Sequence, residues 1–364
     1  MLVVCAEARA EDYVSVRGAY YRETSTRVIQ PMVEVERDSP GQGVDVTAHY
    51  LVDAITSASA SAGVGVDSLF TEIRNDVGLA IRKRWERTDA SIGYRYSSES
   101  DYWSHSFGGS VDHRFWGDTA QLSLALGVNL DSLTARGRTP YCAAAGSFSC
   151  SLDGYYGGLT YTQVWSPVLI TQVSGESLFL DGFQGNVYRS VPNFGYERLP
   201  SERLRLAASG RVAYYMPSMS TGIQFQYRYY HDLWPGSSPS GSDPWNINGH
   251  TFELRVSHEI ARDFEVRLSY RQYFQDSASF WCDALVRTDC YGQGAIWYST
   301  DPKLGSMHTE YPEVKVFWEA ERLANVPVLR WFARGTFEIS YGVYFQSTGF
   351  GDAKLLQAGY RMPY

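Results

Sequence analysis

The chain has 364 residues, a formal net charge of −8 and 20% charged residues, whereas aromatic residues make up 15%. With 27 Tyr, 10 Trp and 33 Gly, the composition favours strands and turns over helices, and the length fits either two ordinary domains or one large all-β domain. An acidic chain lacks the basic face that displaces counterions from nucleic acid, which excludes wholesale nucleic-acid binding.

The N-terminal segment MLVVCAEARAEDY ends its apolar stretch with Ala8-Arg9-Ala10, the small-x-small pattern of a secretory cleavage site. Because no basic segment precedes it and the apolar part is short, we interpret residues 1–10 as the remnant of an export signal; a disordered tip is the alternative. A lipid anchor at Cys5 is disfavoured, since the preceding Leu-Val-Val lacks small residues. Residues 11–364 are expected to form one domain.

Residues 71–85, TEIRNDVGLAIRKRW, place most charged side chains at even positions and apolar side chains at odd positions. On a helix, at about 100° per residue, the charges would point in every direction, whereas on a strand they share one face. The pattern therefore predicts a strand of about fifteen residues, longer than the usual five or six of soluble proteins. Such a length approaches that of a tilted membrane-spanning strand with an extension.

The same alternation recurs along the chain, most clearly in residues 119–130, 221–233, 251–260, 264–274 and 329–345. With weaker segments included, the sequence predicts about sixteen strands, within a range of about fourteen to eighteen. Their expected bounds are 12–23, 26–38, 43–52, 69–86, 89–98, 101–115, 118–131, 152–166, 168–181, 202–216, 220–232, 247–260, 262–275, 307–320, 328–346 and 353–364.

The connections between these strands alternate in length. Tight turns such as RTD and WGD follow the even-numbered strands, whereas most odd-numbered strands are followed by long segments. This asymmetry is typical of outer-membrane barrels, and no apolar run is long enough for a spanning helix. The long segments are 53–68, 132–151, 182–201, 233–246 and 276–306.

The predicted fold is an all-β, antiparallel up-and-down transmembrane barrel, because strands in hydrocarbon must pair every backbone group and close on themselves. A soluble sandwich is the alternative. About sixteen strands leave an aqueous lumen, and an Arg on the lipid face would cost roughly 2 to 4 kcal/mol. Aromatic residues near strand ends suit the interfacial girdles, namely Tyr102, Trp103, Trp116, Trp165, Trp234, Trp297 and Trp331.

The C-terminal segment LLQAGYRMPY alternates to a final aromatic residue. It is similar to the C-terminal assembly signal of bacterial outer-membrane proteins, which implies that Tyr360, Met362 and Tyr364 are recognised by the barrel assembly machinery. Outer-membrane lipid is the other expected partner.

Four cysteines lie in long polar stretches as two pairs, Cys142 with Cys150 and Cys282 with Cys290, each with seven intervening residues. An even number in loop-like sequence favours two local disulfides in an oxidising compartment. Zinc is disfavoured, because structural zinc sites use closer cysteine spacings and no His lies near either pair.

The segments STRVIQP (25–31), HYLVDAITSAS (49–59), TEIRNDVG (71–78) and YRYSSESDYWS (94–104) resemble a family of proteobacterial outer-membrane proteins catalogued as a domain of unknown function. The resemblance extends over the whole chain and is most specific in HYLVDAITSAS. The resemblance implies a barrel in the outer membrane, and it implies no enzymatic reaction.

No motif for nucleophilic, metal-dependent or phosphate-binding catalysis is present, and the seven His are scattered. Asp112 and His113 are adjacent, so on a strand they would face opposite ways. We expect neither an enzyme nor a cofactor or metal. The small, polar segment 53–65 is interpreted as a loop that folds into the lumen as a constriction or plug; a plain surface loop is the alternative.

Arginines are expected to outnumber acids on the inner face by about two to one. Part of this set would form a cross-strand lattice that stiffens the wall, and the remainder would favour anions or an acidic polymer. The expected inner-face residues are Arg74, Arg82, Arg84, Arg95, Arg205, Arg211, Arg228, Arg255, Arg267, Arg271, Arg330, Arg334, Glu72, Asp76, Glu253, Glu259, Glu265 and Glu338.

The predicted function is therefore a porin-like conduit for small or anionic solutes or a polymer. The alternative is a non-conducting barrel that anchors a surface or envelope-spanning complex through its long loops, with envelope proteins as partners.

Overall fold

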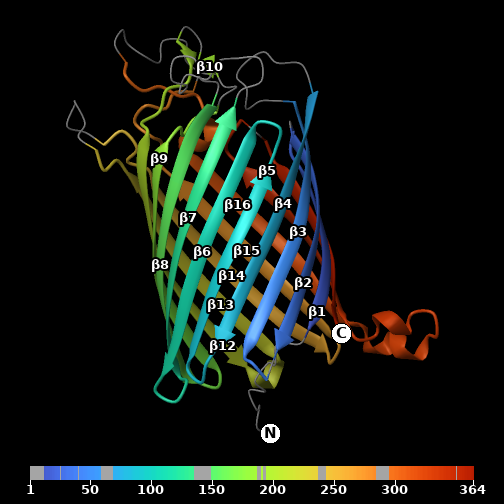
Figure 1. Cartoon of the computed structure of the whole chain (residues 1–364). Coiled ribbons are helices and arrows are strands. Elements are labelled where there is room, and N and C mark those ends of the chain that lie inside the picture. The colour runs from blue at the N-terminus through green and yellow to red at the C-terminus, as the bar shows by residue number, and fades with distance from the viewer. Residues whose placement is uncertain are drawn as a thin grey trace.

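Sixteen antiparallel strands form one closed barrel in the computed structural model (Figure 1), and the described ends of the chain meet where Tyr364 N–H donates to Asp12 O. The structure describes residues 12–24, 26–39, 41–58, 69–134, 149–186, 190–191, 194–236, 243–283, 295–349 and 351–364. The barrel strands are β1 (Tyr13–Arg22), β2 (Thr26–Ser39), β3 (Val44–Ala58), β4 (Leu69–Arg84), β5 (Thr88–Ser98), β6 (Tyr102–Phe115), β7 (Ala120–Thr134), β8 (Ser149–Ser166), β9 (Leu169–Gly182), β12 (Glu202–Met216), β13 (Thr221–Leu233), β14 (Asn248–Ala261), β15 (Phe264–Gln275), β16 (Met307–Glu319), β17 (Thr336–Gln346) and β18 (Ala353–Pro363).

The barrel closes between its first and last strands. β1 pairs with β18 over its whole length, from Tyr13 opposite Pro363 to Arg22 opposite Lys354. A short pair, β10 (Ser190–Val191) and β11 (Gly195–Tyr196), forms a separate sheet. Because every barrel strand has two neighbours, no edge is left open, as a membrane-spanning sheet requires. The predicted fold class is confirmed.

The sixteen predicted strands are all present, and two of them differ from the expected bounds by more than a few residues. β3 continues to Ala58, so residues 53–58 belong to a strand and not to a loop. Residues 59–65 lie outside the described residues, and the constriction hypothesis for them stays a prediction.

The second difference concerns residues 328–346, which were expected to form one strand. β17 begins only at Thr336, and the preceding segment contains two 3-10 helices, η4 (Ala320–Asn325) and η5 (Arg330–Phe332). Successive turns, Val326 N–H to Leu323 O and Leu329 N–H to Val326 O, use backbone groups that a strand would need for pairing. The placement of Arg330 and Arg334 in the barrel wall was therefore wrong.

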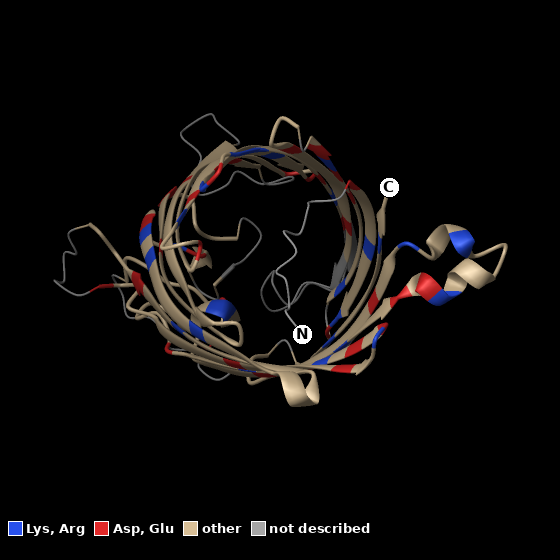
Figure 2. Cartoon of the chain, turned by 90° about the horizontal axis from the view of Figure 1, so that it is seen from below, with Lys and Arg blue, Asp and Glu red and all other residues tan. Residues whose placement is uncertain are grey.

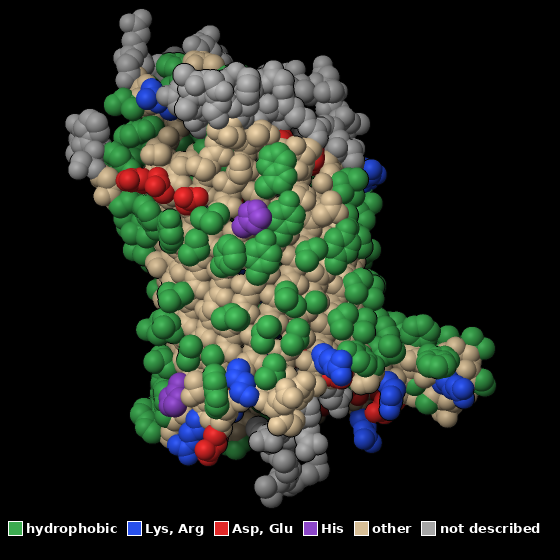
Figure 3. All heavy atoms as spheres, in the orientation of Figure 1, with side chains coloured by type: hydrophobic (Ala, Val, Ile, Leu, Met, Phe, Trp, Pro, Cys, Tyr) green, Lys and Arg blue, Asp and Glu red, His purple; other side chains and the backbone are tan. Residues whose placement is uncertain are grey.

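The outer surface of the wall is apolar. Ile73, Val77 and Leu79 of β4 are about half exposed, whereas the intervening Asp76 is fully buried on the opposite face. On the face seen in Figure 3, hydrophobic side chains are spread over the wall, and charged side chains lie mainly near the two ends. This distribution is the one that a bilayer selects, because charges on the lipid face are costly.

The aromatic girdle prediction was wrong for three of its residues. Tyr102 faces inward, where its hydroxyl binds Asp131. Trp234 and Trp297 pack edge-on against each other, with ring centroids 5.1 Å apart, beside a buried cluster formed by the connections.

The two ends of the barrel differ in their connections. At one end, here the short-turn end, described turns such as 116–119, 217–220 and 262–263 join the strands. At the other, here the long-connection end, Trp245, Ile247, Ala278, Phe280 and Leu304 form a buried apolar cluster, which we call the cap cluster. Described parts of these connections lie within the barrel outline in the view along its axis (Figure 2). In the part of the chain that is described, no helix is long and apolar enough to cross a membrane.

Cys150 and Cys282 are both buried, and each is disulfide-bonded. Cys142 and Cys290, their expected partners, lie outside the described residues. Which cysteines pair therefore stays a prediction.

Candidate functional site: the charged inner face

The strand registers define which side chains share the inner face. Arg82 of β4 lies opposite Asp45 of β3, and Arg95 of β5 lies opposite Gly78 of β4, so the even positions of β4 and the odd positions of β3 and β5 point the same way. When the same alternation is followed from strand to strand around the barrel, all expected inner-face residues lie on the inner face except Arg330 and Arg334. Asp112 and His113 lie on opposite faces, as expected.

Among the described residues, the inner-face charges of β2 to β5 form three ion-pair groups, besides a 3.6 Å contact between Asp89 and Arg114 of β6. Arg84 donates to Asp38 and Asp45, at 2.5 and 2.6 Å. Arg95 Nε lies 2.7 Å from an Asp76 oxygen, and His49 Nε2 lies 3.0 Å from the other. These contacts join residues on neighbouring strands, so they stiffen the wall as a cross-strand lattice.

The third group on this side lies nearer the long-connection end. Arg74 pairs with the buried Asp53 and lies 4.0 Å from Glu99, in the turn between β5 and β6. Burial raises the pKa of the Glu99 carboxyl, and the nearby Arg74 charge partly opposes this shift.

A second lattice lies on β9, β12 to β17 and β1. Arg203 pairs with Asp232, which is fully buried, and Arg205 Nε lies 3.7 Å from the other carboxylate oxygen. The remaining pairs have separations of 2.7 to 3.3 Å, and they are Arg228 with Glu176, Arg255 with Glu253, Arg267 with Glu265, and Lys315 and Arg17 with Glu338.

Three expected inner-face arginines have no acidic partner within 4.0 Å among the described residues. Arg271 instead donates to the Tyr344 hydroxyl at 2.6 Å and lies over the Tyr311 ring. Arg82 and Arg211 make neither an ion pair nor a side-chain hydrogen bond with the described part of the chain. Of the expected inner-face arginines that the structure describes, these two remain available to a solute.

The expected two-to-one excess of arginines was wrong. The registers place further acids on the inner face, so that acids are at least as numerous as bases over the described strands. A sequence signal for some of them exists, because MVEVERD (32–38) alternates like the opening of β4. The missed acids are Glu34, Glu36, Asp38, Asp45, Asp53, Asp89, Asp112, Asp131, Glu176, Asp232 and Glu313.

The middle part of the inner face on β6 to β9 is nearly uncharged and carries mostly small side chains, which we call the neutral arc. Its members alternate with lipid-facing residues such as Leu124 and Leu126. Apart from Tyr156, whose ring lies beside Gly158, the side chains are small and leave the lumen wide beside this arc. The arc consists of Ser104, Ser106, Gly108, Ser110, Ser123, Ala125, Gly127, Asn129, Gly154, Tyr156, Gly158, Thr160, Thr162, Gln172 and Ser174.

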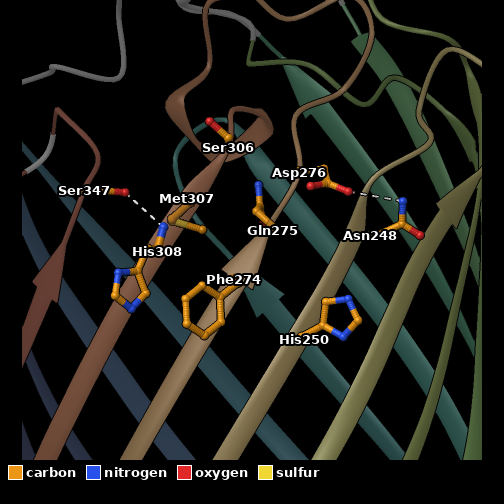
Figure 4. A pocket seen from close by; sticks show the side chains of 9 residues that line it. All are labelled: Asn248, His250, Phe274, Gln275, Asp276, Ser306, Met307, His308 and Ser347. Atoms are coloured by element: carbon orange, nitrogen blue, oxygen red, sulfur yellow. Dashed lines mark hydrogen bonds between the residues drawn. The ribbon is translucent and has the colours of Figure 1, made fainter.

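A pocket of about 380 Å³ lies at the long-connection end, on the outer side of β14 to β16 (Figure 4). His250, Phe274 and His308 lie side by side on three neighbouring strands, opposite one another in the registers. Phe274 and His308 stack with centroids 4.5 Å apart. On each strand these residues occupy the positions between inner-face residues, so the pocket lies on the outer side and is separate from the lumen. Its residue types fit the amphipathic aromatic girdle of a barrel.

Most of the chain is similar in sequence to one protein family. A family model described as "Protein of unknown function (DUF3570)" matches residues 65–151 and 155–328. No curated protein sequence matches the chain.

Solved structures with a similar fold are outer-membrane barrels. A bacterial polysaccharide outer membrane secretin superposes with a TM-score of 0.54 at 9% identity, covering 98% of this chain and 99% of that chain. CdiB from Acinetobacter baumannii gives 0.53 at 6% identity, covering 96% of this chain and 60% of that one. Pseudomonas aeruginosa OccD3 (OpdP) gives 0.47 at 9% identity, covering 97% and 91%. At such identities the likeness is one of fold.

Proposed function

Since the chain belongs to the DUF3570 family of proteins of unknown function, and since it folds as a closed barrel of sixteen strands, we propose that it resides in the outer membrane as a conduit for small polar or charged solutes. The single observation that carries this proposal is the opposition of an apolar outer face to a charged inner face along the same strands.

The size of the barrel supports a water-filled interior. Eight strands enclose only their own side chains, whereas barrels of about sixteen strands leave an aqueous channel. Ion-paired arginines and acids line such a channel at little cost, because water and the partner charge both solvate them. The outer band, in contrast, needs a lipid environment.

The balance of inner-face charges argues for weak ion selectivity. Most inner-face arginines are held by carboxylates, so their field on a passing ion is largely cancelled. Arg82 and Arg211 supply two cations on different parts of the wall. The neutral arc gives a wide path beside the charged strands, which suits solutes of mixed polarity better than a purely anionic polymer.

The decisive experiment uses two glycines that differ only in the face they occupy. Gly108 lies in the neutral arc, and the Cβ atom of a larger residue would meet only the Leu126 carbonyl oxygen at 3.7 Å. Gly210 lies on the outer face with nothing within 4 Å of such a Cβ. Neither substitution to Trp should distort the wall, because both sites have room.

In planar bilayers, the protein should conduct, Gly108→Trp should lower the single-channel conductance, and Gly210→Trp should leave it unchanged. A barrel that inserts and stays silent would overturn the conduit. A conductance that is equal in all three proteins would leave the conduit standing and would refute the path along the neutral arc.

A specific observation favours the second candidate, a non-conducting anchor. The cap cluster packs two connections at the long-connection end into a small buried core in which Trp245 is fully buried, and Leu199 of a third connection packs against it. Such an ordered cap can present a fixed surface to an envelope partner. A silent but inserted barrel, whose cap is needed to retain a partner in cells, would support this function.

A further inference from the structure

The connection between β16 and β17 is unlike the tight turns at the same end of the barrel. Residues 320–335, here called the lateral lobe, leave the barrel and return where Ala320 N–H donates to Gly335 O at 3.0 Å. In Figure 1 the lateral lobe, coloured red, projects sideways from the base of the barrel and not along its axis. It therefore lies beside the wall and outside the path of a solute.

The lateral lobe is attached to the lipid-facing side of the wall. The Phe332 ring packs against Phe337 and Tyr360, with centroids 6.3 and 5.5 Å apart, and the Tyr360 hydroxyl donates to Phe332 O. Phe337 and Tyr360 are outward-facing partners in the β17–β18 register. These contacts place the base of the lobe at the margin of the apolar outer surface.

A salt bridge fixes the lobe on its other side. Arg322 Nε lies 2.7 Å from Asp263, in the tight turn between β14 and β15. The lobe is thus held at the level of the short turns, where the apolar surface ends. Figure 3 shows hydrophobic and basic side chains together on this projection.

The lateral lobe exposes more apolar surface than isolated side chains on a soluble protein would. Val328 is 81% exposed and Trp331 is 74% exposed, and Val326, Leu329 and Phe332 are each exposed by two fifths or more. Contiguous apolar side chains of this kind mark a contact with a membrane or a partner. Trp and Arg together are the residue types of the membrane interface, because each combines an apolar body with a polar group.

We propose that the lateral lobe lies in the head-group region of the membrane leaflet at the short-turn end. There Trp331 and Val328 enter the acyl chains, and the exposed Arg330 and Arg334 bind the phosphates of anionic phospholipids. Continuity with the lipid-facing aromatic side chains favours lipid over a protein as the occupant. The inference rests on the proposed membrane location, but it does not depend on whether the barrel conducts.

The lobe would act as a one-sided interfacial anchor. Because it projects from one point on the circumference, it would resist movement of the β16–β17 side of the barrel out of the leaflet. The basic pair would add an attraction of about fivefold per arginine for an anionic surface.

The test measures the depth of Trp331 in the whole protein. The protein, Trp331→Phe and Trp165→Phe are inserted into vesicles of phosphatidylcholine brominated on its acyl chains, with or without phosphatidylglycerol. Difference spectra against each variant isolate the emission of the lost tryptophan. Trp165 is the matched control, because it is 64% exposed on the outer face of β8.

The proposal predicts that the emission of both Trp331 and Trp165 is quenched. Quenching of Trp331 should be stronger with phosphatidylglycerol, and the Arg330→Gln, Arg334→Gln double variant should lose this increase. Quenching of Trp165 alone overturns the lipid assignment and leaves the lobe as a protein-docking surface. Quenching of Trp331 that is independent of phosphatidylglycerol overturns the role of the arginines. If neither component is quenched, the membrane location itself fails, and the proposed function fails with it.

Discussion

Arg95 and Asp76 form a hydrogen-bonded ion pair between β5 and β4 on the inner face, in which Arg95 Nε lies 2.8 and 2.7 Å from the two carboxylate oxygens. The Asp76 side chain is fully buried and also contacts His49 Nε2 of β3, so one carboxylate connects three neighbouring strands. A buried charge that is satisfied in this way becomes costly when either the charge or its partners are changed.

Asp76→Asn is therefore expected to destabilise the barrel by about 2 to 4 kcal/mol, because the amide cannot accept all of these bonds. The measurement is the temperature at which the compact band on an unboiled gel converts to the extended form. Arg82→Gln is the matched control, since Arg82 has no ion-pair partner among the described residues. Equal transition temperatures for the two variants would refute the lattice role of Asp76.

The unpaired inner-face arginines are expected to influence ion selectivity. Replacing both Arg82 and Arg211 by Gln removes two charges that no described carboxylate neutralises, so the reversal potential in a salt gradient should move toward cation preference. Arg27→Gln removes an exposed charge on the outer face of β2 and should leave the reversal potential unchanged. A shift of the same size in the Arg27 variant would contradict the prediction.

The cap cluster is expected to depend on Trp245. This side chain is fully buried, packs edge-on against Phe280 with centroids 5.0 Å apart, and donates from Nε1 to Glu202 O. Trp245→Ala should remove about 3 to 5 kcal/mol of packing from the cap, because a large cavity replaces the ring. Hydrogen exchange should rise in residues 276–283 and 295–304 while the barrel strands keep their protection.

Trp165→Ala is the control for the cap experiment, because it removes an equally large ring from the outer face. Unchanged exchange in the cap connections of Trp245→Ala would show that the cluster does not order them. Faster exchange in the strands would mean that the cap and the wall unfold together.

The two cysteine pairs are expected to be local disulfides, Cys142 with Cys150 and Cys282 with Cys290. Peptide mapping of the unreduced protein should recover these linked peptides, and a link between Cys150 and Cys282 would contradict the assignment. Because each bridge would lie at one connection, and short closed loops gain the least from cross-linking, reduction should affect the connections and leave the compact barrel band intact.

The sequence by itself determined the wall of this protein. In TEIRNDVGLAIRKRW the period of two assigns each side chain of β4 to a face, and the observed exposure of Ile73, Val77 and Leu79 follows it. The same local rule located the sixteen barrel strands, apart from the start of β17, and the asymmetry of their connections. Alternation and turn lengths are properties of neighbouring residues, so they can be read without the fold.

Tertiary structure alone decided which charges meet and what the connections do. Asp38 and Asp45 both pair with Arg84 of β4, and Arg228 of β13 pairs with Glu176 of β9. These partners are far apart in the sequence, so no local pattern predicts the pairs. Residues 328–335 alternate like a strand, yet Leu329 and Trp331 lie in the lateral lobe. A strand exists only where a neighbour supplies hydrogen bonds, and closure of the ring determines where those neighbours are.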